Sequence, residues 1–234
     1  MIYLQNLCKT YTLNGKHKVV ADDITAIFPS GVSVALLGRN GAGKSSLLRM
    51  ISGAMLPSSG KVLSTGTISW PVGFAGSFSG ELTGEQNCRF VARIYGVDTE
   101  ELLYFVQDFA ELGDHFKLPI RTYSSGMRSR LAFGLSMAVP FDTYLVDEVS
   151  AVGDAAFRTK SNRVFNERMS NAGAIVVAHS MGMLRETCHA GAVLEQGKLT
   201  FYPDLEDAIA AHMVNMQQAK KIRTYRTACN LSKI

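Results

Sequence analysis

The chain has 234 residues, a hydrophobic share of 47% and a formal net charge of +4, which suits one large or two small globular domains. Its longest apolar stretch, residues 131–141, is interrupted by Gly134, Ser136 and Pro140 and is shorter than the roughly 20 residues that span a bilayer. No signal-like region opens the chain, and its four cysteines lack the close pairs of zinc or redox motifs. We therefore expect a cytoplasmic protein with reduced thiols and no membrane span.

The positive charge is concentrated at the C-terminus. The last acidic residue is Asp207, and five basic residues follow it: Lys220, Lys221, Arg223, Arg226 and Lys233. Such a tail fits anionic lipid headgroups or an acidic partner, and it fits equally a solvated end with no partner. Only one aromatic residue, Tyr225, lies among these charges, so we expect no nucleic-acid partner.

The predicted elements alternate along the chain. Short β-rich runs predict strands at residues 2–7, 19–28 and 32–37, within 61–70, and at 143–146, 174–178 and 192–194. Apolar residues at helical spacing predict helices at 46–51, across 83–112 and at 131–139. This order predicts an α/β fold with a parallel core and an inserted helical lobe at about residues 75–138.

Residues 38–45 form a complete G-x-x-x-x-G-K-[ST] phosphate-binding loop between a predicted strand and a predicted helix. The candidate nucleotide-binding residues are Gly38, Arg39, Asn40, Gly41, Ala42, Gly43, Lys44, Ser45 and Ser46. Glycines let successive N–H groups point at phosphate oxygens, and the following helix adds its N-terminal dipole. Lys44 supplies a cation for the β- and γ-phosphates, and the Ser45 hydroxyl is a Mg²⁺ ligand. The loop therefore predicts binding of ATP or GTP.

An apolar strand at residues 144–146 ends in two carboxylates, Asp147 and Glu148, about 100 residues after the loop. In phosphate-loop enzymes the first such acid holds Mg²⁺. Glu148 is then placed to act as the general base that activates the attacking water. Many strands end in acids, so the prediction depends on the phosphate loop upstream.

Residues 122–131 lie just before that acidic strand and resemble the Leu-Ser-Gly-Gly-Gln signature of ATP-binding cassette (ABC) ATPases. Ser124, Ser125 and Gly126 correspond to its central residues, while Tyr123 and Met127 depart from the common letters. The resemblance implies that this segment binds the γ-phosphate of ATP held by a second copy of the chain. A helix that begins here would offer its N-terminal N–H groups to that anion.

Three further positions match ABC motifs in the expected order. His179, after the strand at 174–178, resembles the switch histidine that contacts the γ-phosphate, and Tyr11 resembles the aromatic that stacks on adenine. Residues 151–154 resemble the D-loop, with Asp154 near the dimer seam. The resemblance implies a phosphate-loop NTPase of the ABC type at residues 1–212, with an N-terminal antiparallel β-subdomain, an inserted helical lobe, and a basic tail at 213–234.

Residues 69–76 and 81–85, taken with the signature segment, look more closely like the ATP-binding subunits of capsular polysaccharide exporters of Gram-negative bacteria. One departure from general ABC proteins is that no glutamine lies between Gln5 and Gln86, where the Q-loop glutamine is expected near Gly73 or Phe74. Trp70 could instead shape a groove that faces a permease, or it could pack in the core. Both interpretations stay open.

The resemblance implies a peripheral ATPase on the cytoplasmic face of the inner membrane, with ATP and Mg²⁺ as cofactors. One loop and one signature cannot complete a site within a chain, so a head-to-tail homodimer is expected. A separate multispanning permease would carry the capsular polysaccharide. An O-antigen exporter ATPase is the alternative, although many of those carry an extra C-terminal sugar-binding domain that a chain of this length would lack. A soluble ABC ATPase is a further alternative.

Overall fold

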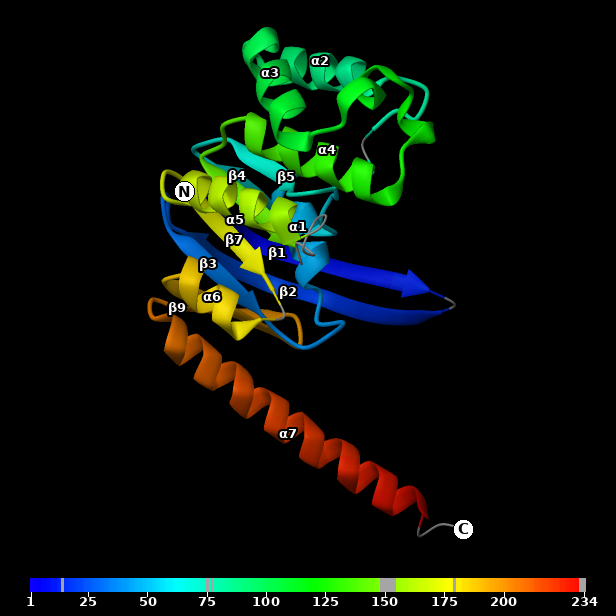
Figure 1. Cartoon of the computed structure of the whole chain (residues 1–234). Coiled ribbons are helices and arrows are strands. Elements are labelled where there is room, and N and C mark those ends of the chain that lie inside the picture. The colour runs from blue at the N-terminus through cyan, green and yellow to red at the C-terminus, as the bar shows by residue number, and fades with distance from the viewer. Residues whose placement is uncertain (14, 75, 77, 148–154, 179, 232–234) are drawn as a thin grey trace.

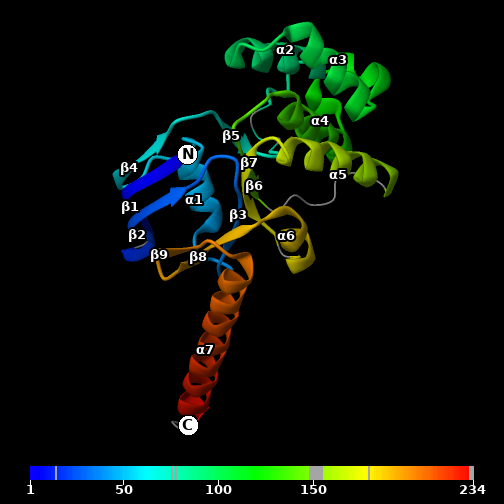
Figure 2. The same ribbon diagram turned by 90° about the vertical axis from the view of Figure 1, so that its left-hand side faces the viewer.

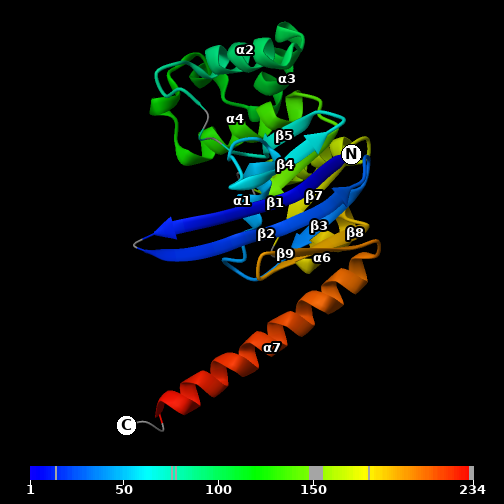
Figure 3. The same cartoon turned by 180° about the vertical axis from the view of Figure 1, so that it is seen from behind.

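The computed structural model describes residues 1–13, 15–74, 76, 78–147, 155–178 and 180–231. These residues form two sheets, a helical lobe and a long C-terminal helix (Figure 1). The lobe lies on one side of the sheets, and the last helix extends away from the other side, as Figures 2 and 3 also show. None of the described helices is both long and apolar enough to cross a membrane.

The first sheet is antiparallel, with strand order β2-β1-β4. Its strands are β1 (Ile2–Leu13), β2 (Lys16–Phe28) and β4 (Ser59–Ser64). This confirms the predicted N-terminal β-subdomain, but both hairpin strands continue beyond the predicted 2–7 and 19–28. The apolar pattern stops there, whereas backbone pairing continues between polar residues such as Thr12 and His17. Exposed hairpin ends need no apolar alternation, because both faces meet water.

The second sheet has the order β5-β6-β7-β3-β8-β9. Its strands are β3 (Ser33–Leu37), β5 (Ile68–Pro71), β6 (Thr143–Asp147), β7 (Gly173–Val177), β8 (Ala190–Glu195) and β9 (Lys198–Tyr202). Every neighbouring pair is parallel except β8 and β9. The parallel core is therefore confirmed, and β9 is an addition that the sequence pattern did not reveal. Strands β3 and β7 are buried along their whole length, as expected for a sheet covered on both faces.

The helical lobe contains α2 (Gly84–Tyr95), α3 (Thr99–Ala110) and α4 (Ser125–Ala138), with short 3₁₀ turns at Gly113–Lys117 and Ile120–Thr122. The sequence predicted one helical stretch across 83–112, and the structure divides it at Gly96. Gly96 adopts a left-handed conformation and ends α2, and the Asp98 side chain caps α3 by accepting from the Glu101 N–H (2.8 Å).

Four helices surround the second sheet or extend from it: α1 (Lys44–Ile51), α5 (Ala155–Met169), α6 (Met181–Thr187) and α7 (Leu205–Leu231). Only α1 was predicted from periodicity. The residue at which the basic tail was expected to begin, 213, lies inside α7. That helix is one continuous backbone element, while the division into a domain and a tail stays a prediction about function.

The lobe is held by an aromatic cluster around Phe109 of α3. Its ring stacks on Phe133 of α4 at 5.6 Å and meets Phe157 of α5 edge-on at 5.1 Å. Gly134 gives this ring its space, since a Cβ there would lie 2.9 Å from Phe109 Cδ1. The cluster joins the lobe to the core through residues from three helices.

Phe109→Ala should lower the free energy of unfolding by about 3–5 kcal/mol, because it leaves a cavity among three aromatic rings. Chemical denaturation would measure it. Tyr104→Ala in the same helix is the matched control. The Tyr104 side chain is 79% exposed, so its loss should change stability by less than about 0.5 kcal/mol. Equal effects of the two substitutions would contradict the packing described here.

Candidate nucleotide-binding site

The phosphate-binding loop leaves the end of β3 and is wedged between the two sheets. Gly38 lies so close to β8 that a Cβ there would be 2.5 Å from the Leu194 carbonyl oxygen. Gly43 (φ 111°) lies against β2, where a Cβ would be 2.9 Å from Val20 Cβ. Any larger side chain at either position would push the loop from its place. The glycines are therefore required by close approach as well as by backbone conformation.

Lys44 is directed at its own loop in this structure. Its ammonium donates to the carbonyl oxygens of Gly38 (2.7 Å) and Arg39 (3.2 Å). The Ala42 N–H also donates to the Arg39 carbonyl (3.0 Å), which closes the loop. This arrangement places the Lys44 cation next to the N-terminus of α1, and recognition of a polyphosphate requires both.

A cavity of about 410 Å³ opens beside the loop. It is lined by Tyr11, Lys18, Val20, Asn40, Gly41, Gly43, Lys44, Ser45 and Ser46. The structure thus brings Tyr11 to the predicted phosphate-binding residues. Its hydroxyl makes a hydrogen bond with Ser46 Oγ (3.0 Å), and its side chain is 37% exposed. The Lys9 ammonium lies over this ring at 5.4 Å, and an aromatic ring beside the loop suits stacking of an adenine base.

Lys18 was missed by sequence reasoning. It lies directly across the β1–β2 hairpin from Tyr11 and brings a second cation to the cavity. The sequence did contain a signal for Lys18, because Tyr11 and Lys18 lie at equal distances along the chain from the predicted turn at 14–15. Pairing across a hairpin therefore identifies Lys18 once Tyr11 is accepted.

Asp147 ends β6, and the register pairs it with Val177 of β7, which in turn lies beside β3. It is therefore at the same carboxyl edge of the sheet as the phosphate loop, where ligands of open α/β sheets bind. Glu148, Asp154 and His179 lie outside the described residues. The serine hydroxyl of Ser45 and the carboxylate of Asp147 are hard oxygen donors that fit Mg²⁺. Among the residues that the structure describes, no three or more His, Cys, Asp or Glu side chains are grouped so that they could bind a metal ion.

The signature segment begins α4 in the helical lobe. Ser124 caps the helix by accepting from the Met127 N–H (3.2 Å), and Ser124, Ser125 and Gly126 are all exposed. None of them lines the cavity at the loop. The structure therefore keeps the predicted signature residues apart from the phosphate loop of the same chain, and leaves them on the surface.

Tyr123, which departs from the common signature letters, is buried. Its hydroxyl donates to the His115 carbonyl (2.6 Å), and it fills the space beside Gly84, where a Cβ would lie 2.5 Å from that oxygen. Burial raises the pKa of the Tyr123 phenol, so it remains a neutral donor. The unusual tyrosine of the signature segment therefore serves the packing of the lobe, and Ser124 and Ser125 beside it remain exposed.

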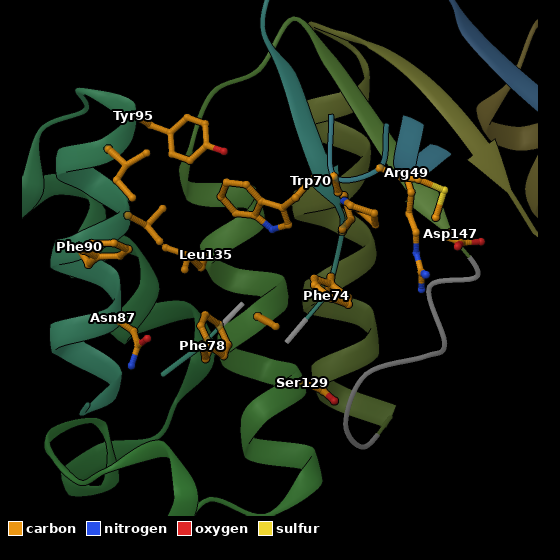
Figure 4. A pocket seen from close by; sticks show the side chains of 18 residues that line it. Arg49, Trp70, Phe74, Phe78, Asn87, Phe90, Tyr95, Ser129, Leu135 and Asp147 are labelled. Carbon is orange, nitrogen blue, oxygen red and sulfur yellow. The ribbon is translucent and has the colours of Figure 1, made fainter. Parts of the chain in front are cut away.

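A larger cavity of about 790 Å³ lies between the core and the helical lobe. In Figure 4, Trp70, Phe74 and Phe78 lie in the middle of this cavity. The α2 side chains Asn87, Phe90 and Tyr95 lie on one side of them, and Arg49 and Asp147 lie on the other. Its full lining is Arg49, Ala54, Met55, Trp70, Pro71, Val72, Gly73, Phe74, Phe78, Asn87, Phe90, Val91, Ile94, Tyr95, Ser129, Ala132, Leu135 and Asp147. Because Asp147 lines it, this apolar cavity reaches the acidic end of β6.

Trp70 packs against its neighbours, as the core interpretation expected, while the interpretation that it faces a permease stays a prediction. Its indole N–H donates to Ser136 Oγ (2.9 Å), and its ring packs against Tyr95 and Phe141 at centroid distances of 5.2 and 5.3 Å. It is also part of the cavity lining. Where a Q-loop glutamine was expected, the chain places Gly73, whose N–H donates to the same serine oxygen (3.3 Å), and a half-exposed Phe74.

Comparison with known proteins agrees with this geometry. The family model described as "ABC transporter" matches residues 21–151. The chain belongs to the ABC transporter family. It is 51% identical to the polysialic acid transport ATP-binding protein KpsT of Escherichia coli over 213 residues, which cover 89% of this chain and 95% of that one.

Two other relatives of this ABC chain are similar over comparable lengths. The ATP-binding protein BexA of Haemophilus influenzae is 43% identical, with 89% of this chain and 96% of that one covered. The capsule polysaccharide export ATP-binding protein CtrD of Neisseria meningitidis serogroup B is 42% identical, with the same coverage. The predicted resemblance to capsular polysaccharide exporter ATPases is thereby confirmed.

Solved structures confirm the predicted ABC fold. The ATP-binding cassette MJ0796, in a dimeric structure bound to ADP and Pi, aligns with a TM-score of 0.71 at 19% identity and covers 88% of this chain and 99% of its own. An ATP-binding subunit of an ABC transporter aligns with a TM-score of 0.73 at 20% identity, covering 93% and 99%. Together, the family match and the curated relatives make this chain an ATP-binding ATPase.

Lys44→Ala should weaken ATP binding by roughly tenfold to a hundredfold, because a charged hydrogen bond to phosphate is lost, and should abolish hydrolysis. Binding of a fluorescent ATP analogue and phosphate release would measure the two effects. Lys16→Ala, at the exposed start of β2, is the charge-matched control and should change neither. Near-normal hydrolysis by Lys44→Ala would overturn the assignment of Lys44.

Proposed function

We propose that this chain is the ATP-hydrolysing subunit of a transporter that exports capsular polysaccharide across the inner membrane. The observation that supports it most directly is the 42–51% identity to ATP-binding proteins whose names state polysialic acid transport and capsule polysaccharide export. The alternative, an O-antigen exporter ATPase, would use the same nucleotide site. The relatives favour capsule.

In the proposed mechanism each residue at the loop has a separate task. Tyr11 stacks on the adenine, the loop N–H groups hold the phosphates, and Lys44 turns from its own carbonyls to the β- and γ-phosphates. Ser45 and Asp147 would hold Mg²⁺, which supplies charge neutralisation on the phosphates. Glu148 takes the proton of the attacking water, and His179 orients that water.

A second copy of the chain completes the proposed site. Ser124, Ser125 and Gly126 are exposed at the start of α4, where they are available to the ATP of a partner. A two-fold, head-to-tail dimer then holds two ATP molecules at its seam. The dimeric cassette among the structural neighbours supports this arrangement.

The 790 Å³ cavity is the proposed docking groove for a separate, multispanning permease. Two apolar residues of α2, Phe90 and Ile94, line this cavity and are each 60% exposed to solvent. Aromatic and aliphatic side chains beside a concave surface are typical anchors for a partner segment. Since Asp147 also lines the cavity, a segment bound there would lie close to the hydrolysis site. This proposal places the chain on the cytoplasmic face of the inner membrane.

Glu148→Gln should bind ATP normally but hydrolyse it at least about a hundredfold more slowly, since an amide accepts no proton from the water. Trapped ATP should then hold two chains together. Gel filtration with ATP and Mg²⁺ would show the dimer, and Ser124→Ala in the same background should weaken it. A monomer with undiminished hydrolysis would count against both the base and the shared site.

Phe90→Asp and Ile94→Asp test the groove and the export function together. Both should bind ATP like the unsubstituted chain but lose co-purification with a permease from detergent-solubilised membranes, because a charge would be buried in an apolar contact. A strain that carries either variant in place of the natural gene should accumulate polysaccharide inside the cell. Immunostaining of surface and interior would measure it.

Tyr104→Asp on α3 is the matched control, since this exposed aromatic lies outside the cavity lining. Trp70→Ala is a poorer probe, because it also breaks the Tyr95 and Phe141 packing. Normal surface capsule in a strain without the gene would refute capsule export. If O-antigen is then retained inside, the alternative holds, and defective translation or DNA repair would indicate a soluble ABC ATPase.

A further inference from the structure

A third cavity borders the phosphate loop, and α7 forms one of its walls. It measures about 420 Å³ and is lined by loop residues, by the ends of β3 and β7, and by two α7 side chains, His212 and Met216. Helix α7 packs on β3, β8 and β9. The C-terminal helix therefore reaches the phosphate loop through a cavity that Tyr11 does not line.

His212 occupies a position on α7 where an apolar residue is expected. Leu205, Ala208 and Ile209 precede it on the same face and are buried, at the spacing of a core-facing helix stripe. His212 is only 8% exposed, and its Nδ1 is buried without a hydrogen-bond partner. A buried polar atom without a partner costs stability, so its retention calls for a reason.

A second unpartnered atom has the complementary chemistry. Among the described residues, the buried side-chain atoms without a hydrogen-bond partner are His212 Nδ1 and Glu195 Oε2. One can donate and the other accepts. Glu195 ends β8 next to Leu194, whose carbonyl touches Gly38, and it forms a loose ion pair with Arg39 of the loop (3.8 Å). Both side chains therefore lie next to phosphate-loop residues.

The charges around His212 depend on the position of Lys44. Burial and the nearby Lys44 ammonium lower the pKa of His212, while the Glu195 carboxylate raises it. In this structure Lys44 is held on the Gly38 and Arg39 carbonyls. A triphosphate in the loop would attract that ammonium and compensate its charge, so that the Glu195 carboxylate would act on the His212 imidazole with less opposition.

We propose that His212 and Glu195 form a hydrogen-bonded pair when a nucleoside triphosphate fills the phosphate loop, and that this pair ties α7 to the loaded site. Both are positioning residues, since they act on the loop and do not touch the phosphates. The pair links the C-terminal helix to nucleotide occupancy. The inference rests on ATP binding at the loop and is independent of the export function.

The test uses the full chain with His212→Leu, Glu195→Met and the double variant. Without nucleotide, His212→Leu should have an unfolding midpoint equal to or above that of the unsubstituted chain, because it removes an unpartnered buried atom. Its affinity for a non-hydrolysable ATP analogue should nevertheless fall about threefold to tenfold. Glu195→Met should weaken binding similarly, and the double variant should be no weaker than either single one.

Matched variants separate this pair from general packing. Met216→Leu, in the same cavity wall, should change neither stability nor affinity, and His212→Gln, which keeps an N–H donor, should retain most of the affinity. Addition of the analogue should slow hydrogen exchange in residues 205–215 of the unsubstituted chain but not of His212→Leu. Unchanged affinity in His212→Leu, parallel losses of stability and affinity, or additive effects in the double variant would each overturn the proposal.

Discussion

The close fit of the phosphate loop between two sheets is the constraint on which the rest of the site depends. Gly38 touches the end of β8, and Gly43 touches β2 of the antiparallel sheet. A loop held by both sheets brings their contributions to one place: Tyr11 and Lys18 from the first, and the carboxyl edge with Asp147 from the second. Rigid strands carry these groups, which is the arrangement that precise binding requires.

The lining of the 790 Å³ cavity differs from the lining that a Q-loop glutamine would provide. Gly73 and Phe74 stand where that amide was expected, and Trp70 is anchored to Ser136 just before them. The wall of the cavity is therefore apolar and aromatic. From residues 70–74 the cavity receives apolar and aromatic surface and backbone groups, and no side-chain amide.

The signature helix is also connected to the helix that follows the acidic strand. Glu111, at the end of α3, binds Lys160 of α5 (2.7 Å) and lies 4.0 Å from Arg130 of α4, whose guanidinium stacks on Phe157 at 4.4 Å. Individual ion pairs at partly exposed positions contribute little to stability. Their effect here is geometric, since they fix the orientation of α4 relative to α5 together with the Phe109 cluster.

The sequence by itself determined the phosphate loop, the acidic strand, the order of the ABC motifs and the parallel core, because each depends on local spacing and on backbone chemistry. It did not reveal α5, α6 or α7, because α5 has no clear apolar stripe, α6 is only seven residues long, and the apolar stripe of α7 is confined to its first turns. Nor could it show that Trp70 both packs in the core and lines the cavity, or that His212 borders the loop. Those placements depend on which surfaces meet in space, and only the packed structure decides that.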